Sequence, residues 1–189
     1  MKILVIDNYD SFTYNLVNYL RELSEAKIDV YRNDKIDIEE VGNYDKIVIS
    51  PGPGVPEDAG IIIDIIKRWA PEKSILGVCL GCQAIAESFG GEILNLETVY
   101  HGVASSMTVT DKSDRIFSEI PEDFTAGRYH SWVIDEDKLP LEIKITARDE
   151  EGMIMAVSHE KYDLKGVQFH PESVLTQHGK KMISNWLDL

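Results

Sequence analysis

The sequence has few cysteines and no long apolar run, and each shortage excludes a class of protein. Two cysteines in 189 residues cannot build the disulfide framework of a small secreted domain. The longest strictly apolar run is the five residues Met153–Val157, against the roughly 20 that cross a bilayer. The N-terminus leads into a predicted strand rather than a signal peptide, so we expect a cytoplasmic protein without a membrane anchor.

Basic residues are also scarce. The chain has nineteen Lys and Arg but thirty-three Asp and Glu, so its formal net charge at pH 7 is −14. Such a charge repels phosphate backbones and anionic lipids, so nucleic acids and membranes are not expected partners. The acidic residues are scattered along the chain, as on an ordinary hydrated surface.

Glycine is absent where a nucleotide-binding protein needs it. The turn after the first predicted strand, Asp7–Ser11, contains none, and the first glycine of the chain is Gly42. The dinucleotide fingerprint is therefore missing. The only Gly-Lys pair, Gly179-Lys180, lacks the flanking residues of a phosphate-binding loop, which excludes that route to nucleotide hydrolysis.

The remaining composition is that of a globular α/β protein. Hydrophobic residues make up 43% of the chain, and its length fits one domain over residues 1–189. Apolar strand patterns alternate with helical ones, which predicts an open, mostly parallel, twisted sheet with helices on both faces. Closely spaced short strands between residues 92 and 168 predict a small antiparallel sheet at its edge. The predicted strands are Ile3–Ile6, Ile28–Tyr31, Lys46–Ile49, Ile75–Val78, Val103–Thr110, Ile143–Arg148, Met153–Ser158 and Gly166–Phe169.

The helical segments follow from apolar residues at helical spacing. The first begins at Phe12 behind the candidate caps Asp10 and Ser11. The other predicted helices are Gly60–Trp69, one that starts near Gly81, and one over Met182–Leu187.

The fourth predicted strand runs into a pattern that suits a nucleophile. Gly77-x-Cys79-x-Gly81 has the small residues that let a sharp strand-to-helix turn expose a reactive side chain. A helix N-terminus would also favour the thiolate of Cys79. Two alternatives stay open: a buried structural cysteine, and a redox pair formed by Cys79 and Cys82.

A histidine and a carboxylate follow the last predicted strand. On an extended backbone residues i and i+2 point the same way, and Pro171 prevents a helix, so Glu172 can reach the imidazole of His170. A carboxylate that orients a histidine facing a thiol is the arrangement of a catalytic triad. The alternative is a surface ion pair.

The segment after the third predicted strand is rich in proline and glycine. Between residues 51 and 54 only Gly52 and Gly54 carry a backbone N–H, on a chain stiffened by three prolines. Such a rigid turn suits an oxyanion hole, with the Leu80 N–H as its second donor. A rigid surface loop is the alternative.

The remaining histidines carry less information. His101, His159 and His178 are expected at the surface or as caps, whereas His130 could line the same cleft. The histidines show no metal-ligand spacing, and the Cys-x-x-Cys pair lacks a second pair, so no metal site is expected.

Together these segments resemble the class I, triad-type glutamine amidotransferases. Within that family the chain resembles anthranilate synthase component II and the amidotransferase subunit of aminodeoxychorismate synthase. The matching motifs, in order along almost the whole chain, are Asp7–Asn15, Ser50–Gly54 with Pro56, Gly77–Gly81 with Gln83, Gly127–Ser131 and Gly166–Ser173.

The resemblance implies a flavodoxin-like fold and glutamine hydrolysis at Cys79, with His170 as acid and base and Glu172 as the residue that orients it. It implies an oxyanion hole made by the N–H groups of Gly52 and Leu80. It also implies a site that grips both ends of the glutamine backbone and comprises Gly52, Gly54, Gln83, Tyr129, His130 and Ser131.

The resemblance also implies a large partner subunit that uses chorismate, because this chain has no room for a second active site. Anthranilate, for tryptophan synthesis, is the expected product, and aminodeoxychorismate, for folate synthesis, is the alternative. No cofactor is expected in this chain, and Mg²⁺ is expected in the partner. Two residues depart from the family pattern: Cys82 stands where His is common, and Val103 stands where Lys is usual.

Overall fold

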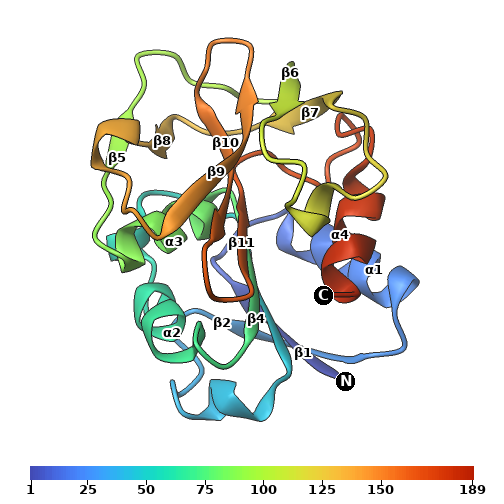
Figure 1. Cartoon of the computed structure of the whole chain (residues 1–189). Helices are drawn as coiled ribbons and strands as arrows, with labels where there is room; N and C mark the ends of the chain where they lie inside the picture. Colours follow the sequence, from blue (N-terminus) through green and yellow to red (C-terminus); the bar gives the residue numbers. More distant parts are fainter.

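Five parallel strands form one half of a nine-stranded sheet in the computed structural model, which describes residues 1–189 (Figure 1). Their order across the sheet is β2-β1-β3-β4-β11. Val78 at the end of β4 lies beside Val167 at the end of β11. The bounds are β1 Lys2–Asp7, β2 Lys27–Arg32, β3 Lys46–Ile49, β4 Ser74–Val78 and β11 Leu164–Val167.

Four antiparallel strands continue the same sheet in the order β10-β9-β6-β7. A separate two-stranded antiparallel sheet pairs β5 with β8. The bounds are β5 Ile93–Asn95, β6 Val103–Val109, β7 Asp123–Arg128, β8 Trp132–Ile134, β9 Ile143–Asp149 and β10 Ile154–His159.

Helices cover both faces of the parallel half, two on each face (Figure 1). Successive side chains of β1 point to opposite faces, so Ile3 and Val5 pack with α1 and α4, whereas Leu4 and Ile6 pack with α2 and α3. The bounds are α1 Thr13–Leu23, α2 Ile62–Trp69, α3 Leu80–Ser88 and α4 Gly179–Leu187. Short 3-10 helices span Glu40–Asn43, Pro56–Asp58, Arg115–Phe117 and Glu136–Lys138.

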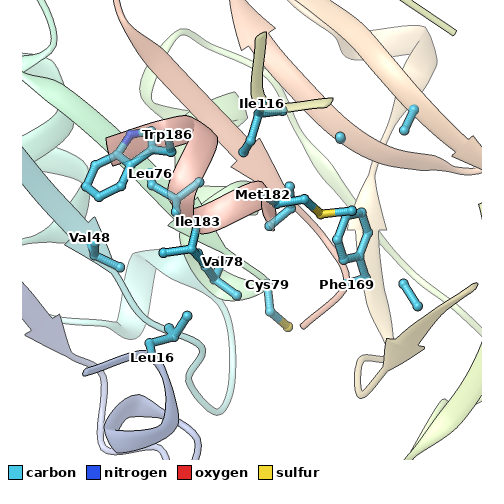
Figure 2. Packing of buried hydrophobic residues seen from close by; sticks show 14 of the residues in the cluster. Leu16, Val48, Leu76, Val78, Cys79, Ile116, Phe169, Met182, Ile183 and Trp186 are labelled. Carbon is cyan, nitrogen blue, oxygen red and sulfur yellow. The ribbon is translucent and has the colours of Figure 1, made fainter. Parts of the chain in front are cut away.

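The core under α1 and α4 extends to the edge where the parallel strands end. Figure 2 shows Trp186, Ile183 and Met182 of α4 over Leu76 and Val78 of β4. Cys79 lies at the margin of this cluster, on the side of Phe169. The nucleophile candidate is thus attached directly to the packed core.

The predicted fold class and most elements are confirmed, with three corrections. The prediction of an antiparallel edge strand at Gly166–Phe169 is wrong, because β11 lies in the middle of the sheet and runs parallel to β4. The caps Asp10 and Ser11 are wrong as well: α1 begins at Thr13 without a side-chain cap, and Asp10 accepts from the N–H of Phe12 instead. Strands β5, β7 and β8 were not predicted.

No helix has the length and apolar character that crossing a membrane requires; the longest, α1, has 11 residues.

Candidate active site

Cys79 occupies a strained turn between β4 and α3. Its φ of 53° and ψ of −102° are unusual for a residue other than glycine. The glycines on either side let the turn pack closely. A Cβ on Gly77 would lie 2.3 Å from the carbonyl oxygen of Gly81, and a Cβ on Gly81 would lie 2.4 Å from that of Ile49. The local sequence therefore forms the sharp turn that it predicts, with the thiol at the start of a helix.

His170 and Glu172 form a buried pair just beyond β11. The Nδ1 atom of His170 lies 2.8 Å from Oε1 of Glu172, and both residues are at most 3% exposed. The imidazole packs against the rings of Phe12 and Tyr129, with centroids 5.1 and 4.7 Å away. Its Nε2 atom is buried and has no hydrogen-bond partner within the protein, so this nitrogen is available to a reacting group.

The environment of His170 favours its protonated form. Burial lowers the pKa of His170, but the neighbouring side chains of Cys79 and Glu172 outweigh it and raise that pKa to about 10. At neutral pH the imidazolium would offer an N–H at both ring nitrogens, with Glu172 as the acceptor for Nδ1. A proton is then held at Nε2, where a leaving group can take it.

The cavity beside Cys79 has a volume of about 180 Å³. It brings together every predicted substrate and oxyanion residue, while His170 and Glu172 are buried outside its lining. Pro53 and Trp132 also contribute to its wall and were not predicted. The lining residues are Gly52, Pro53, Gly54, Cys79, Leu80, Gln83, Tyr129, His130, Ser131 and Trp132.

The predicted oxyanion loop is held tightly against β1. Asn8 donates from its backbone N–H to the hydroxyl of Ser50 at 3.0 Å and from Nδ2 to the Ser50 carbonyl at 2.7 Å. A Cβ on Gly52 would lie 2.5 Å from Cδ2 of Leu80 and 2.6 Å from Cβ of Asn8. Gly52 therefore lies directly against Leu80, the other residue predicted to supply an oxyanion N–H group.

His130 belongs to a buried network that fixes the opposite wall. Burial and the charge of Arg128 lower the pKa of His130 to about 3. Arg128 donates from Nε to Nε2 of His130 at 3.1 Å, so the proton of this neutral ring is on Nδ1, 3.0 Å from the carbonyl of Trp132. Arg128 also pairs with the buried Asp149 at 2.7 Å.

The other histidines lie elsewhere. His101 is exposed. The expected surface position of His159 is wrong: the residue is buried, and its Nδ1 accepts two backbone N–H groups of the following turn. His178 precedes α4 without capping it through its side chain. No group of three or more His, Cys, Asp or Glu side chains gathers as a metal site would require.

Cys82 points away from the cavity. It is fully buried and packs against β11, where a Cβ on Gly166 would lie 2.9 Å from its sulfur. Burial raises the pKa of the Cys82 thiol strongly. A thiol so placed cannot readily attack a mixed disulfide on Cys79, which argues against the redox alternative.

Gln168 also lies beside Cys79, although the motifs alone do not single it out. Its side chain is completely buried, and its Nε2 lies 3.5 Å from the sulfur of Cys79. A signal was present, because residues i and i+2 of an extended segment point the same way and Gln168 stands two residues before His170.

The sequence of this chain matches the family model described as "Glutamine amidotransferase class-I" over residues 4–189. The chain belongs to this family. It is 48% identical to Anthranilate synthase component 2 of Cyanophora paradoxa, over 98% of both proteins. It is 46% identical to Aminodeoxychorismate/anthranilate synthase component 2 of Bacillus subtilis, over 98% of this chain and 95% of that protein.

The chain also matches part of a longer relative. Bifunctional protein TrpGD of Thermotoga maritima is 46% identical to the whole of this chain, which spans 32% of that protein. Among solved structures, a putative GMP synthase protein from Thermoplasma acidophilum has a TM-score of 0.88 and 27% identity, and the match covers 100% of this chain and 92% of that one. The resemblance predicted from the motifs is confirmed, and the chain is a glutamine amidotransferase.

Proposed function

We propose that this chain hydrolyses glutamine at Cys79 and delivers the ammonia to a large, chorismate-using subunit that makes anthranilate. The observation that carries the proposal is the Cys79 thiol itself, which lies in a strained turn, lines an open cavity and neighbours the buried His170–Glu172 pair. The family to which the chain belongs performs this chemistry on glutamine.

The proposed reaction proceeds in two halves. The thiolate of Cys79 attacks the carboxamide carbon of glutamine and forms a C–S bond, while the N–H groups of Gly52 and Leu80 hold the oxyanion. His170 gives its Nε2 proton to the departing nitrogen, so the C–N bond breaks and ammonia leaves a glutamyl thioester. His170 then removes a proton from water, which attacks the thioester and releases glutamate and the thiolate. Glu172 keeps the imidazole oriented throughout.

Substrate recognition is assigned to the far wall of the cavity. Gln83 donates from Nε2 to the carbonyl of Trp132 at 2.9 Å, which leaves Oε1 to accept from the α-ammonium group of glutamine. Tyr129, His130 and Ser131 line the same wall and, with Gly54, complete the site for the amino-acid end of the substrate. Arg128 and Asp149 hold this wall from behind.

The proposed partner is supported by the names of the relatives. Two of them are called component 2 of a synthase, which implies a component 1, and the B. subtilis name carries both anthranilate and aminodeoxychorismate. Aminodeoxychorismate synthesis is therefore the second candidate for the same chemistry. We propose no cofactor for this chain and place the expected Mg²⁺ in the large subunit.

The test is glutamate release by the purified chain, alone and with each of the two chorismate-using large subunits of the same organism, in the presence of chorismate. We expect weak release alone and strong stimulation by the anthranilate-forming subunit, with anthranilate as the product. Stimulation only by the aminodeoxychorismate-forming subunit would favour the second candidate. No glutamate release in any combination would exclude glutaminase activity.

A further inference from the structure

The sulfur of Cys79 has a polar neighbour besides the catalytic histidine. Nε2 of Gln168 lies 3.5 Å from it, and the carbonyl oxygen of Gln168 lies 3.1 Å from Nε2 of Gln83. Gln83 in turn reaches the carbonyl of Trp132 at 2.9 Å. The three contacts form a continuous chain from the wall of the substrate cavity to the nucleophile.

The direction of every hydrogen bond in this chain follows from one fixed point. The Trp132 carbonyl can only accept, so the Gln83 atom that faces it must be its NH₂ group. That same NH₂ group faces Gln168, so the Gln168 atom there must be its oxygen. The other end of the Gln168 amide is therefore an N–H donor, and it points at the sulfur.

A donor aimed at this sulfur acts on its charge state. Cys79 is only 6% exposed and Gln168 is 0% exposed, so little water reaches the contact. A buried anion is costly unless hydrogen bonds compensate for the lost water, and a donor to the charged form favours that form. The Gln168 amide contacts the sulfur and not the imidazole. Nε2 of His170 therefore has no hydrogen-bond partner within the protein and is free for the leaving group.

We propose that Gln168 is a positioning residue that stabilises and orients the Cys79 thiolate, with Gln83 as its anchor. This inference rests on the proposed function for its catalytic consequence. It makes Gln83 a residue with two roles, because one end of its amide lines the substrate cavity and the other fixes the donor to the nucleophile.

Two nearly isosteric substitutions test it. Gln168→Met removes the N–H donor and keeps the length of the side chain. Methionine adapts well to buried sites. Gln168→Glu replaces the donor with an acceptor that can carry a negative charge. A Cys82→Ala background makes Cys79 the only thiol of the chain, so alkylation by iodoacetamide as a function of pH reports on Cys79 alone.

We expect the pH midpoint of Cys79 alkylation to rise by about one unit in Gln168→Met, and by more in Gln168→Glu. For glutamine turnover we expect a lower kcat at neutral pH, because a smaller share of Cys79 is then in the reactive thiolate form, with KM nearly unchanged. Gln83→Met, which frees the Gln168 amide, should shift the midpoint in the same direction by less, and it should raise KM as well.

Equal alkylation midpoints in the parent and in both Gln168 variants, each shown to be folded by its thermal unfolding curve, would overturn the proposal. If a Gln168 variant does not fold, the alkylation midpoint of Gln83→Met tests the proposal instead. An unchanged midpoint in that variant would overturn the proposal. Alkylation needs no glutamine, so a shifted midpoint in a chain without glutaminase activity would reject the proposed function and leave the role of Gln168 intact.

Discussion

The backbone N–H of Cys79 donates a 2.8 Å hydrogen bond to the carbonyl oxygen of Val167, three residues before His170. This bond extends the pairing of β4 with β11 by one residue beyond β4, since Val167 is the last residue of β11. Cys79 and the segment that leads to His170 therefore leave the sheet side by side at its carboxyl edge, where open α/β sheets bind their ligands. Their separation is set by strand pairing, which is more rigid than a loop.

Cys79→Ala should abolish glutamine hydrolysis, with a loss of several orders of magnitude, because the substitution removes the proposed nucleophile. Formation of the aromatic product from added ammonia by the complex with the large subunit should persist, since only the source of ammonia is lost. Glutamate release and product formation are measured on the same preparation. Glutaminase turnover at the parental rate would show that Cys79 is not the nucleophile.

Cys82→Ala is the matched control. Cys82 is buried against Gly166 and lies outside the cavity, so its loss should reduce the free energy of unfolding by about 1–2 kcal/mol through a small void. Glutamine turnover should stay close to that of the parent chain. Urea unfolding and glutamate release check the two expectations. Inactivation as complete as that of Cys79→Ala would revive the redox alternative.

His170 and Glu172 should act as one unit. His170→Ala removes the proposed acid and base, and Glu172→Ala leaves an imidazole without its 2.8 Å contact to the carboxylate. The double substitution should cost far less than the product of the two single losses, because an unoriented imidazole is already a poor catalyst. Glutamine turnover rates of the parent chain, the two single variants and the double variant form the double-mutant cycle that tests this expectation. Multiplicative losses would mean that Glu172 contributes independently of His170.

The sequence predicts the catalytic edge of this fold better than the antiparallel half. The glycines around Cys79 and the proline after His170 affect the backbone only locally. The turn at Cys79 and the extended segment at His170 can therefore be predicted from neighbouring residues. The position of β11 depends on a contact between distant residues. Val167 of β11 pairs with Val78 of β4, which lies almost ninety residues earlier in the chain. Strand β7 contains Gly127 and little alternation, so packing rather than propensity decides it.

The candidate site shows the same division. Motif order identifies most of the residues that line the cavity, including His130. The role of Arg128 behind it depends on Asp149 from a different strand. Gln168 belongs to the motif Gly166–Ser173, but its contact with Cys79 exists only because two strand ends lie side by side. Contacts between residues far apart in sequence are the part that a single sequence does not contain.

Gly77→Ala should destabilise the protein by steric overlap. The added Cβ would lie 2.3 Å from the carbonyl oxygen of Gly81, a backbone atom that cannot move without shifting α3. We expect a loss of about 1–3 kcal/mol or more in the free energy of unfolding and a clear loss of glutamine turnover, because α3 carries Gln83.

Gly152→Ala separates this overlap from backbone strain. Gly152 has a φ of +84° and open space around the position of a Cβ, so alanine there should cost only about 1–2 kcal/mol and leave turnover unchanged. Equal effects of the two substitutions on turnover would contradict the steric account of the turn at Cys79.

His130 should make the protein less stable in acid. Burial and Arg128 lower its pKa to about 3 in the folded chain, against about 6.5 when unfolded. Between these two values the unfolded chain binds more protons, so the stability associated with a neutral His130 is complete above about pH 6.5 and declines as the pH falls towards 3. The raised pKa of His170 places its own titration above this window.

Urea unfolding of the parent chain and of His130→Gln at several pH values between 4 and 8 isolates this contribution. Glutamine does not titrate and can still accept the hydrogen bond from Arg128. The parent should be the more stable protein at pH 8, and its advantage should shrink below pH 6.5 by up to about 1.4 kcal/mol for each pH unit. Carboxylates that titrate in both proteins cancel in the difference. An advantage that stays constant from pH 8 to pH 4 would mean that His130 is protonated in the folded state as readily as in the unfolded one.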